Sequence, residues 1–304
     1  MSLINLFRRR NAHPATQQAA LSSQDEKVLA SLLVMAWVVE ARDPYTGGHL
    51  WRVSRFSRLL ADKAGMAEED AARIAVGGFL HDLGKVGIPD AILGKKDKLT
   101  DDEYAVIKTH PDVGRRMLAG HPFSALVMDA VFAHHETPDG RGYPLGLRGA
   151  EIPTVARIVG ICDAFDAMTS SRPYRHGMPV EKALAIIRDN LGRQFDGEFG
   201  EQFIALGNTD GLGHIVGHTD EGIPLRDCLM CGPTVVVRRD AQPGDAVHCP
   251  ACCSEYRLEG AELRPVATGA KASPATLATR PDEALIQGMI QESARLLSPA
   301  LQAS

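Results

Sequence analysis

One short segment limits what this chain can fold into, because an apolar run ends directly in two polar side chains. Residues 74–80 (IAVGGFL) have the composition of a buried helix, and His81 and Asp82 follow immediately. Burying a carboxylate is strongly unfavourable unless a positive group meets it there. The fold must therefore bring positive charge to the end of this helix.

Length and composition are those of an ordinary globular chain of 304 residues, with 44% hydrophobic and 23% charged residues, which leaves room for one large domain and a small module. A net charge of -5 gives no electrostatic support for binding a nucleic-acid polymer. The longest apolar run, 28–39, is too short to span a bilayer, and polar residues separate it from basic Arg8 to Arg10. We expect no signal peptide, no membrane contact and a cytoplasmic location.

The N-terminal two thirds of the chain have the pattern of a helical domain. Residues 1–22 are polar and low in pattern, which predicts a disordered N-terminus. Residues 23–206 carry successive segments with apolar residues at helical spacing, and strand patterns are sparse. The stretch 136–149 is rich in Gly and Pro and is expected to form an ordered loop. The sequence therefore predicts an all-α domain.

Two helix starts are indicated by capping boxes, in which a hydroxyl residue precedes a glutamate by three positions. Ser23 and Glu26 fit this pattern ahead of the first apolar stretch, and Thr100 and Glu103 fit it again. We expect a helix to begin near Ser23 and another to run from Thr100 past Glu103 to His110.

The C-terminal third differs in composition. Residues 207–225 are predicted to be a linker, and 226–262 a small module with one strand (TVVVRR) between two cysteine pairs. Residues 263–304 are expected to form a flexible tether and a final helix. This helix carries an apolar stripe that we expect to dock on the protein itself, with a homodimer or partner contact as the alternative. The stripe consists of Leu285, Ile286, Met289, Ile290, Leu296 and Leu297.

Five histidines and two aspartates stand at the ends or inside the predicted helices. They are His49, His81, Asp82, His110, His134, His135 and Asp163. Imidazole and carboxylate without thiolate favour iron, manganese, nickel, cobalt or zinc. Since seven ligands exceed what one ion takes, we predict two ions that share one carboxylate. Asp82 suits that role, and two cations beside it would account for the burial of its carboxylate.

Several motifs resemble one family. HDLGK resembles the signature of the HD superfamily of metal-dependent phosphohydrolases, and HHETPDGRGYP is similar to the extended motif of its HD-GYP branch. RDPYTGGH, KTHPDVG, DAFDAMTSSRPYR and GRQFD also match that branch in order and spacing. The resemblance covers residues 25–206 and implies an all-α cyclic di-GMP phosphodiesterase with a metal centre that is often iron. Pro138 stands where the family usually has Trp, which bears on partner contacts more than on chemistry.

The resemblance also implies roles for the metal ligands. One ion would bind His49, His81, Asp82 and Asp163, and the other Asp82, His110, His134 and His135. We expect iron, with manganese as the alternative. The two ions would activate a water molecule as the nucleophile and bind the scissile phosphate.

Three cationic residues are candidates for phosphate chemistry. Lys85 lies one helical turn beyond His81, where it could neutralise the phosphate or protonate the leaving oxygen; a solvated lysine is the alternative. Arg172 and Arg175 match substrate-phosphate contacts of the family, with Arg175 standing where lysine is common. Guanidinium groups bind phosphate in a bidentate manner, although plain surface arginines would need no such role.

The GYP loop is expected to be shaped by a run of six residues and to recognise signalling-protein partners. The run consists of Asp139, Gly140, Arg141, Gly142, Tyr143 and Pro144.

The cysteine pairs CLMC and CPAC are separated by 17 residues, which is typical of a zinc ribbon with four cysteine ligands in tetrahedral geometry. Cys228, Cys231, Cys249 and Cys252 are the predicted ligands, with a hairpin between the two pairs. Iron is the alternative metal. A structural role is expected first and protein binding second. Cys253 is a spare thiol where glycine is usual, and Cys162 is expected to be buried.

The function expected from the resemblance is hydrolysis of cyclic di-GMP to pGpG, with GMP as a further product. Another cyclic dinucleotide or nucleotide as substrate is one alternative, and a non-catalytic sensor or interaction module is another. Some relatives carry a glutamate four residues before the first histidine, which can reach a third ion. Here that position is Tyr45, a poor ligand, and Asp43 lies off that helix face. We therefore predict two catalytic metals and one separate zinc.

Overall fold

The structure is a computed structural model of the chain. It describes residues 22–42, 47–95, 97–170, 177–209, 211–260, 262, 264–273, 275–277 and 282–294. The predicted disordered N-terminus lies outside these residues except for Ser22. Asp43, Tyr45, Arg172 and Arg175 also lie outside them.

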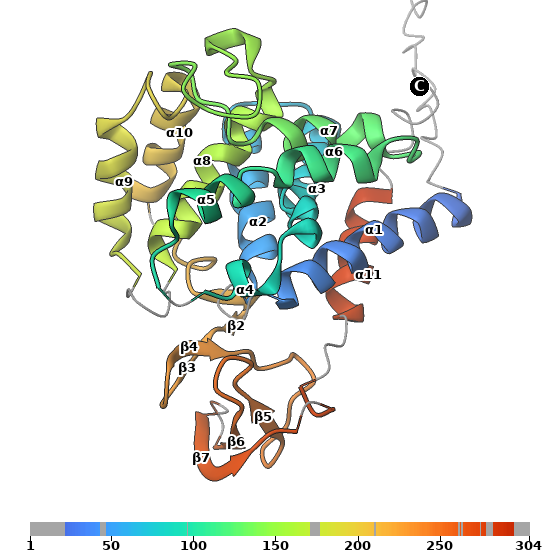
Figure 1. Cartoon of the computed structure of the whole chain (residues 1–304), viewed down its shortest axis with the longest axis vertical. Helices are drawn as coiled ribbons and strands as arrows, with labels where there is room; N and C mark the ends of the chain where they lie inside the picture. Colours follow the sequence, from blue (N-terminus) through green and yellow to red (C-terminus); the bar gives the residue numbers. More distant parts are fainter. Residues whose placement is uncertain are drawn as a thin grey trace, which may run out of the picture.

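A helical domain makes up most of the described chain, as predicted (Figure 1). Its α-helices are α1 (Ser23–Arg42), α2 (His49–Lys63), α3 (Glu68–Leu80), α4 (Asp90–Leu93), α5 (Asp101–Ile107), α6 (His110–Leu118), α7 (Ser124–Ala133), α8 (Thr154–Thr169), α9 (Val180–Asp189) and α10 (Gly197–Asn208). Two short 3-10 helices, η1 (Leu83–Gly87) and η2 (Gly149–Glu151), complete it. Among the described helices, none has the combination of length and apolar character needed to cross a bilayer.

Helix α2 lies at the centre of the domain (Figure 1). It contributes to two hydrophobic clusters. On the side of α8 and α10, Phe56 packs edge-to-face on Phe165 and Phe203, with ring centroids 5.2 and 6.1 Å apart. On the other side, Leu50 packs with apolar residues of α1, α3 and α7. This double packing fixes the N-terminus of α2, where His49 lies.

The helix ends differ from the sequence prediction at two places. Helix α1 begins at Ser23 as expected, but the capping hydrogen bonds join Ser22 and Asp25, one residue earlier than the predicted pair Ser23 and Glu26. The capping box of Thr100 and Glu103 is present at α5. His110 does not end that helix, because α5 stops at Ile107 and His110 is the first residue of α6.

The C-terminal region contains small antiparallel sheets (Figure 1). The pairs are β1 (His218–Asp220) with β2 (Ile223–Pro224), β3 (Arg226–Cys228) with β4 (Gly232–Val235), and β5 (Ala246–His248) with β6 (Ser254–Glu259) and β7 (Arg264–Lys271). The predicted strand TVVVRR is therefore shorter and starts earlier than expected. The predicted hairpin between the cysteine pairs is wrong, since β4 pairs with β3 and β5 pairs with β6.

Two further expectations for this region do not match the structure. Strand β7 lies where a flexible tether was expected, and its backbone hydrogen bonds to β6 hold it. The segment 207–225 is more than a linker, because Leu212 and Ile215 are buried in the core of the helical domain.

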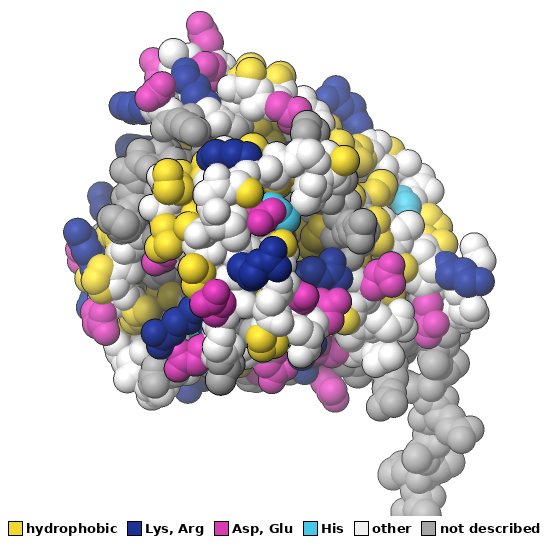
Figure 2. Space-filling view, turned by 90° about the horizontal axis from the view of Figure 1, so that it is seen from below, with side chains coloured by type: hydrophobic (Ala, Val, Ile, Leu, Met, Phe, Trp, Pro, Cys, Tyr) yellow, Lys and Arg dark blue, Asp and Glu magenta, His cyan; other side chains and the backbone are white. Residues whose placement is uncertain are grey.

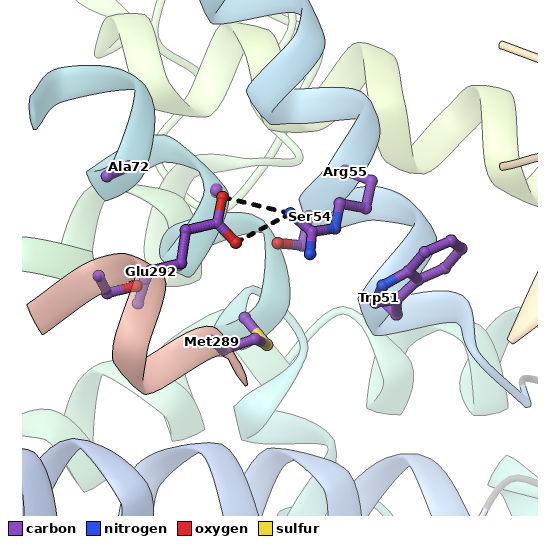
Figure 3. A pocket seen from close by; sticks show the side chains of 9 residues that line it. Trp51, Ser54, Arg55, Ala72, Met289 and Glu292 are labelled. Carbon is purple, nitrogen blue, oxygen red and sulfur yellow. Dashed lines mark hydrogen bonds and ion pairs between the residues drawn. The ribbon is translucent and has the colours of Figure 1, made fainter. Parts of the chain in front are cut away.

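The final helix α11 (Glu283–Ala294) docks on the helical domain, as predicted. Its residues Ile286, Met289 and Ile290 are buried against α1 and α3, while Leu296 and Leu297 lie outside the described residues. Beside a small pocket between α11 and α2, Glu292 accepts a hydrogen bond from Arg55 at 2.9 Å (Figure 3). The chain that follows the cysteine module therefore returns to the helical domain.

Candidate metal centre

The helix ends of the domain converge on the seven residues predicted as metal ligands. His49 begins α2, His81 and Asp82 follow α3, His110 begins α6, His134 and His135 follow α7, and Asp163 lies inside α8. His49, His81, Asp82, His110 and His134 are each at most 6% exposed. Among the described residues, their ligand atoms form three overlapping groups, each within 4.8 Å. The groups are His49, His81 and Asp163; His81, Asp82 and His134; and His110, His134 and His135.

Asp82 lies between the two halves of this cluster. Its Oδ2 is 3.5 Å from Nε2 of His49 and 3.3 Å from Nε2 of His81. Its Oδ1 is 3.5 Å from Nε2 of His110. Asp163 Oδ1 lies 3.5 Å from Nε2 of His49, on the first side. The two carboxylate oxygens of Asp82 thus face different histidines, as a shared ligand requires.

Backbone carbonyls orient three of the imidazoles. Nδ1 of His81 lies 2.7 Å from the carbonyl of Gly78, and Nδ1 of His134 lies 2.8 Å from that of Ala130. His110 makes the same contact with Ile107 at 2.8 Å. Because a carbonyl only accepts, each Nδ1 carries the proton, and Nε2 is the ring nitrogen that faces the centre.

The packing of these nitrogens fits a divalent cation. Nε2 of His110 and Nε2 of His134 are 3.3 Å apart, although each neutral ring presents a lone pair there. Nε2 of His81 is buried without a hydrogen-bond partner. Two nitrogens bound to one ion at about 2.1 Å would be separated by about 3.0 Å in an octahedral site and about 3.4 Å in a tetrahedral one. A cation would therefore remove the repulsion between the lone pairs of His110 and His134 and would give Nε2 of His81 a partner.

The electrostatics of the site favour the ligand forms of His134, His135 and Asp82, whereas His81 must lose a proton to bind a metal. Burial lowers the pKa of His135 to about 3 and lowers the pKa of His134 well below its usual value, so both rings are neutral. Burial opposes ionisation of Asp82, but Lys85 and His81 hold the pKa of its carboxyl well below the usual range. Burial also acts to lower the pKa of His81, yet Asp82 and Asp163 raise it to about 10. Binding of a cation would displace that proton.

Lys85 points into the centre rather than into solvent. Its Nζ lies 2.6 Å from Oδ2 of Asp82, and its side chain is 24% exposed. The alternative of a solvated lysine is thus not what the structure shows. Arg172 and Arg175 lie outside the described residues.

The GYP loop is held against the centre by Glu136, a residue that was not predicted from the sequence. Its buried carboxylate accepts backbone hydrogen bonds from Leu145 at 2.6 Å and Leu147 at 2.9 Å, and a longer one from Gly146. Its position directly after His134 and His135 was the feature of the sequence that could have indicated this role. This carboxylate folds the loop back over the histidines.

Inside the loop, Tyr143 stacks on His135 with ring centroids 4.7 Å apart. A side chain at Gly142 would place a Cβ 2.4 Å from the backbone nitrogen of Thr137, so only glycine permits this approach. Asp139 accepts hydrogen bonds from the Thr137 hydroxyl and the Arg141 backbone nitrogen. The Arg141 side chain itself is 87% exposed. Tyr143 therefore belongs to the centre, whereas Arg141 faces solvent.

Three more polar residues next to the centre were not predicted, namely the half-buried Glu40 and the buried Arg52 and Asp166. Glu40 of α1 accepts a hydrogen bond from the backbone nitrogen of Leu50 at 2.9 Å, and burial raises its pKa to about 6. Asp166 lies 2.8 Å from His49, and Arg52 pairs with Asp166. The second aspartate of DAFDAM, three residues after Asp163, was the one indication in the sequence.

The four predicted zinc ligands also come together. The Sγ atoms of Cys228 and Cys252, and those of Cys231 and Cys249, are 3.5 Å apart, and the group lies within 4.8 Å. The spare thiol Cys253 has a φ of 60°, in the left-handed region where glycine is favoured. Cys162 is fully buried, as expected.

Surface charge matches the low net charge. On the face drawn in Figure 2, cationic and anionic side chains are interspersed.

Helices that meet at buried histidines and aspartates define a metal-binding helical protein of the HD type. A family model for the HD domain matches residues 33–199, more than half of the chain, so this chain belongs to the HD domain family. Membership implies divalent metal binding, in agreement with the buried clusters.

Curated relatives match the same part of the chain. The cyclic di-GMP phosphodiesterase response regulator RpfG of Xanthomonas campestris is 39% identical over 204 residues, which is 63% of this chain and 54% of the relative. The 3'3'-cGAMP-specific phosphodiesterase 3 of Vibrio cholerae is 38% identical, covering 62% and 40%. A cyclic di-GMP phosphodiesterase of Thermotoga maritima is 36% identical, covering 63% and 52%. The chain spans about half the length of these relatives.

Proposed function

We propose that this protein is a metal-dependent phosphodiesterase that hydrolyses cyclic di-GMP to pGpG, and pGpG further to GMP. The observation that carries the proposal is the position of Asp82 between two histidine groups. The names of the relatives in Xanthomonas campestris and Thermotoga maritima support the substrate.

We infer two metal sites in the helical domain. One uses His49, His81, Asp82 and Asp163, and the other Asp82, His110, His134 and His135. The absence of thiolate among these ligands favours iron first and manganese second. When bound, the two ions supply the positive charge that binds the scissile phosphate and activates a water molecule.

The remaining steps belong to the side chains around the ligands. Lys85, now paired with Asp82, is placed to neutralise a phosphate oxygen or to protonate the leaving oxygen. Tyr143 covers His135 and excludes water from one side of the centre. The exposed side chains of Arg141 and Leu145 offer a surface on the GYP loop for a signalling-protein partner.

A different cyclic dinucleotide is the second candidate substrate. The 3'3'-cGAMP-specific relative is 38% identical to this chain, between the 39% and 36% of the two relatives named for cyclic di-GMP. A non-catalytic interaction module is the third candidate, and the presence of every predicted ligand in one buried cluster speaks against it.

Hydrolysis of a panel of cyclic dinucleotides tests the proposal. The protein would be loaded with Fe²⁺ or Mn²⁺ under reducing, anaerobic conditions and given cyclic di-GMP, 3'3'-cGAMP or linear pGpG. We expect pGpG and then GMP from cyclic di-GMP. Faster turnover of 3'3'-cGAMP would select the second substrate, and no turnover of any cyclic dinucleotide by the metal-loaded protein would contradict enzymatic function.

A prediction about phosphate recognition concerns Arg172 and Arg175. Replacing either by alanine should raise KM for cyclic di-GMP about tenfold or more, because a charged hydrogen bond is worth about 1.5–3 kcal/mol. Metal content should not change. Arg141→Ala, an exposed arginine of the GYP loop, is the matched control. Normal KM and kcat in both variants would exclude the RPYR segment as a phosphate site.

We also propose that the module at 226–262 binds one zinc ion through Cys228, Cys231, Cys249 and Cys252. The distances between the four sulfur atoms support a tetrahedral thiolate site, and its role would be to fold the module.

Cys231→Ser should therefore remove one zinc per chain and leave the two other metals bound, since no proposed catalytic ligand lies beyond Asp163. Elemental analysis gives the count, and Cys253→Ser serves as the control. Loss of the catalytic metals together with the zinc would show that the module holds the active site together.

A further inference from the structure

His49 is held differently from the three other imidazoles whose Nδ1 contacts are described above. Its Nδ1 lies 2.8 Å from Oδ2 of Asp166, a carboxylate, where the others meet backbone carbonyls. A carboxylate on the far nitrogen fixes the ring and raises the basicity of the nitrogen that binds metal. The strength of His49 as a ligand therefore depends on Asp166.

Asp166 depends in turn on Arg52. Both side chains are almost completely buried, at 1% and 2% exposure. Nε of Arg52 donates to Oδ1 at 2.6 Å and Nη2 donates to Oδ2 at 3.1 Å, which is a bidentate pair. A buried carboxylate without this partner would be strongly destabilised. Arg52 thus fixes the position of the carboxylate that orients His49.

The other donors of Arg52 reach three separate parts of the chain. Nη1 donates at 2.8 Å to the carbonyl of Gly47, directly before the α2 N-terminus, and at 2.8 Å to the carbonyl of His218 in β1. Nη2 also donates to the hydroxyl of Ser170 at 3.1 Å, at the end of α8. All five N–H groups of the guanidinium are therefore used, and lysine could not make this set of contacts.

The contact with β1 is part of a close interface. At Gly48, a Cβ atom would lie 2.5 Å from Cα of Thr219, and at Gly47 a Cβ would lie 2.9 Å from Cγ2 of Val236. The segment that leads into the cysteine module thus packs directly against the residues before His49. Asp220 stabilises this segment through an ion pair with Arg239.

We propose that Arg52 is a positioning residue of the metal centre, which fixes His49 through Asp166 and links this ligand to the segment that carries the cysteine module. The inference rests on the proposed role of His49 as a metal ligand. It adds that one of the two ions depends on a residue that touches no metal, and that a change in β1 reaches this ion.

Titration of the metal-free full-length protein with Mn²⁺ alone tests the proposal without substrate. In Arg52→Lys, the affinity of one of the two sites in the helical domain should fall about 10–100-fold, the usual effect of losing an outer partner of a ligand. The other site should keep its affinity. Arg55→Ala is the matched control, because Arg55 lies on the same helix and pairs with Glu292 away from the centre.

Ser170→Ala keeps the buried ion pair but removes one acceptor of Arg52 and the hydroxyl that donates to Oδ2 of Asp166 at 3.2 Å. It should weaken the same site a few fold even if Arg52→Lys does not fold, because both lost contacts hold the Arg52–Asp166 pair in place. If each of the two sites binds Mn²⁺ in these variants with the same affinity as in the wild type, whatever the Tm, the role of Arg52 is overturned. A wild type that binds no Mn²⁺ in the helical domain would instead contradict the proposed function.

The link to the module is tested by Asp220→Ala, which should weaken the same site a few fold by releasing β1. Glu262→Ala removes an exposed ion pair with Arg264 elsewhere in the module and is the control. If both variants bind Mn²⁺ as the wild type does, the link through His218 is overturned.

Discussion

Asp82→Asn is expected to abolish cyclic di-GMP hydrolysis, with a loss of at least about 10²–10³-fold, the range for removing one electrostatic group from an active site. An amide has one oxygen, whereas the two oxygens of Asp82 face different histidines at 3.3–3.5 Å. It also carries no charge to balance the cations or Lys85. At least one metal should be lost, and Tm should fall with it.

Steady-state hydrolysis, metal content and Tm should be measured together on this variant. Asp112→Asn is a suitable control, because Asp112 lies near His110 in sequence but forms an exposed pair with Arg115. Turnover near that of the wild type, with both metals bound, would contradict a binuclear mechanism that needs a shared carboxylate.

The groups that meet at the centre could be predicted from the sequence, because a buried carboxylate and five histidines near helix ends are together typical of a metal site. The sequence did not predict that the chain breaks before His110, so that His110 begins a helix instead of ending one. Pro111 lacks a backbone N–H and is favoured in the first turn of a helix, so it marks the start of α6. The apolar periodicity before it had suggested one longer helix.

Two contacts between distant segments could not be predicted from the sequence. Arg52 and Asp166 are 114 residues apart, and the sequence marks Asp166 only as the second aspartate of DAFDAM. Strand β7 is mostly exposed and shows no alternation of apolar and polar residues. Its pairing with β6 depends on backbone hydrogen bonds that no side-chain pattern records.

Gly84→Ala is expected to disrupt both the fold and the metal centre. Gly84 lies in η1, inside the HDLGK motif, where η1 crosses α6. A Cβ on Gly84 would lie 1.8 Å from the carbonyl oxygen of His110 and 2.6 Å from the backbone nitrogen of Gly114. Both are backbone atoms, so no side-chain rotation can relieve the clash, and η1 must move away from α6.

That movement would separate Asp82, which precedes η1, from His110, which begins α6. Their ligand atoms are now 3.5 Å apart. We expect the free energy of unfolding to fall by about 3 kcal/mol, at the upper end for overpacking, and the ion at His110, His134 and His135 to bind more weakly.

Denaturant unfolding and Mn²⁺ titration of the same sample would measure the two effects. Gly197→Ala is the control, because Gly197 begins α10 with open space around its Cα, and this variant should behave as the wild type. Wild-type stability and metal affinity in Gly84→Ala would mean that η1 and α6 can move apart without cost. The close approach of η1 to α6 would then not explain why the HDLGK motif has a glycine at position 84.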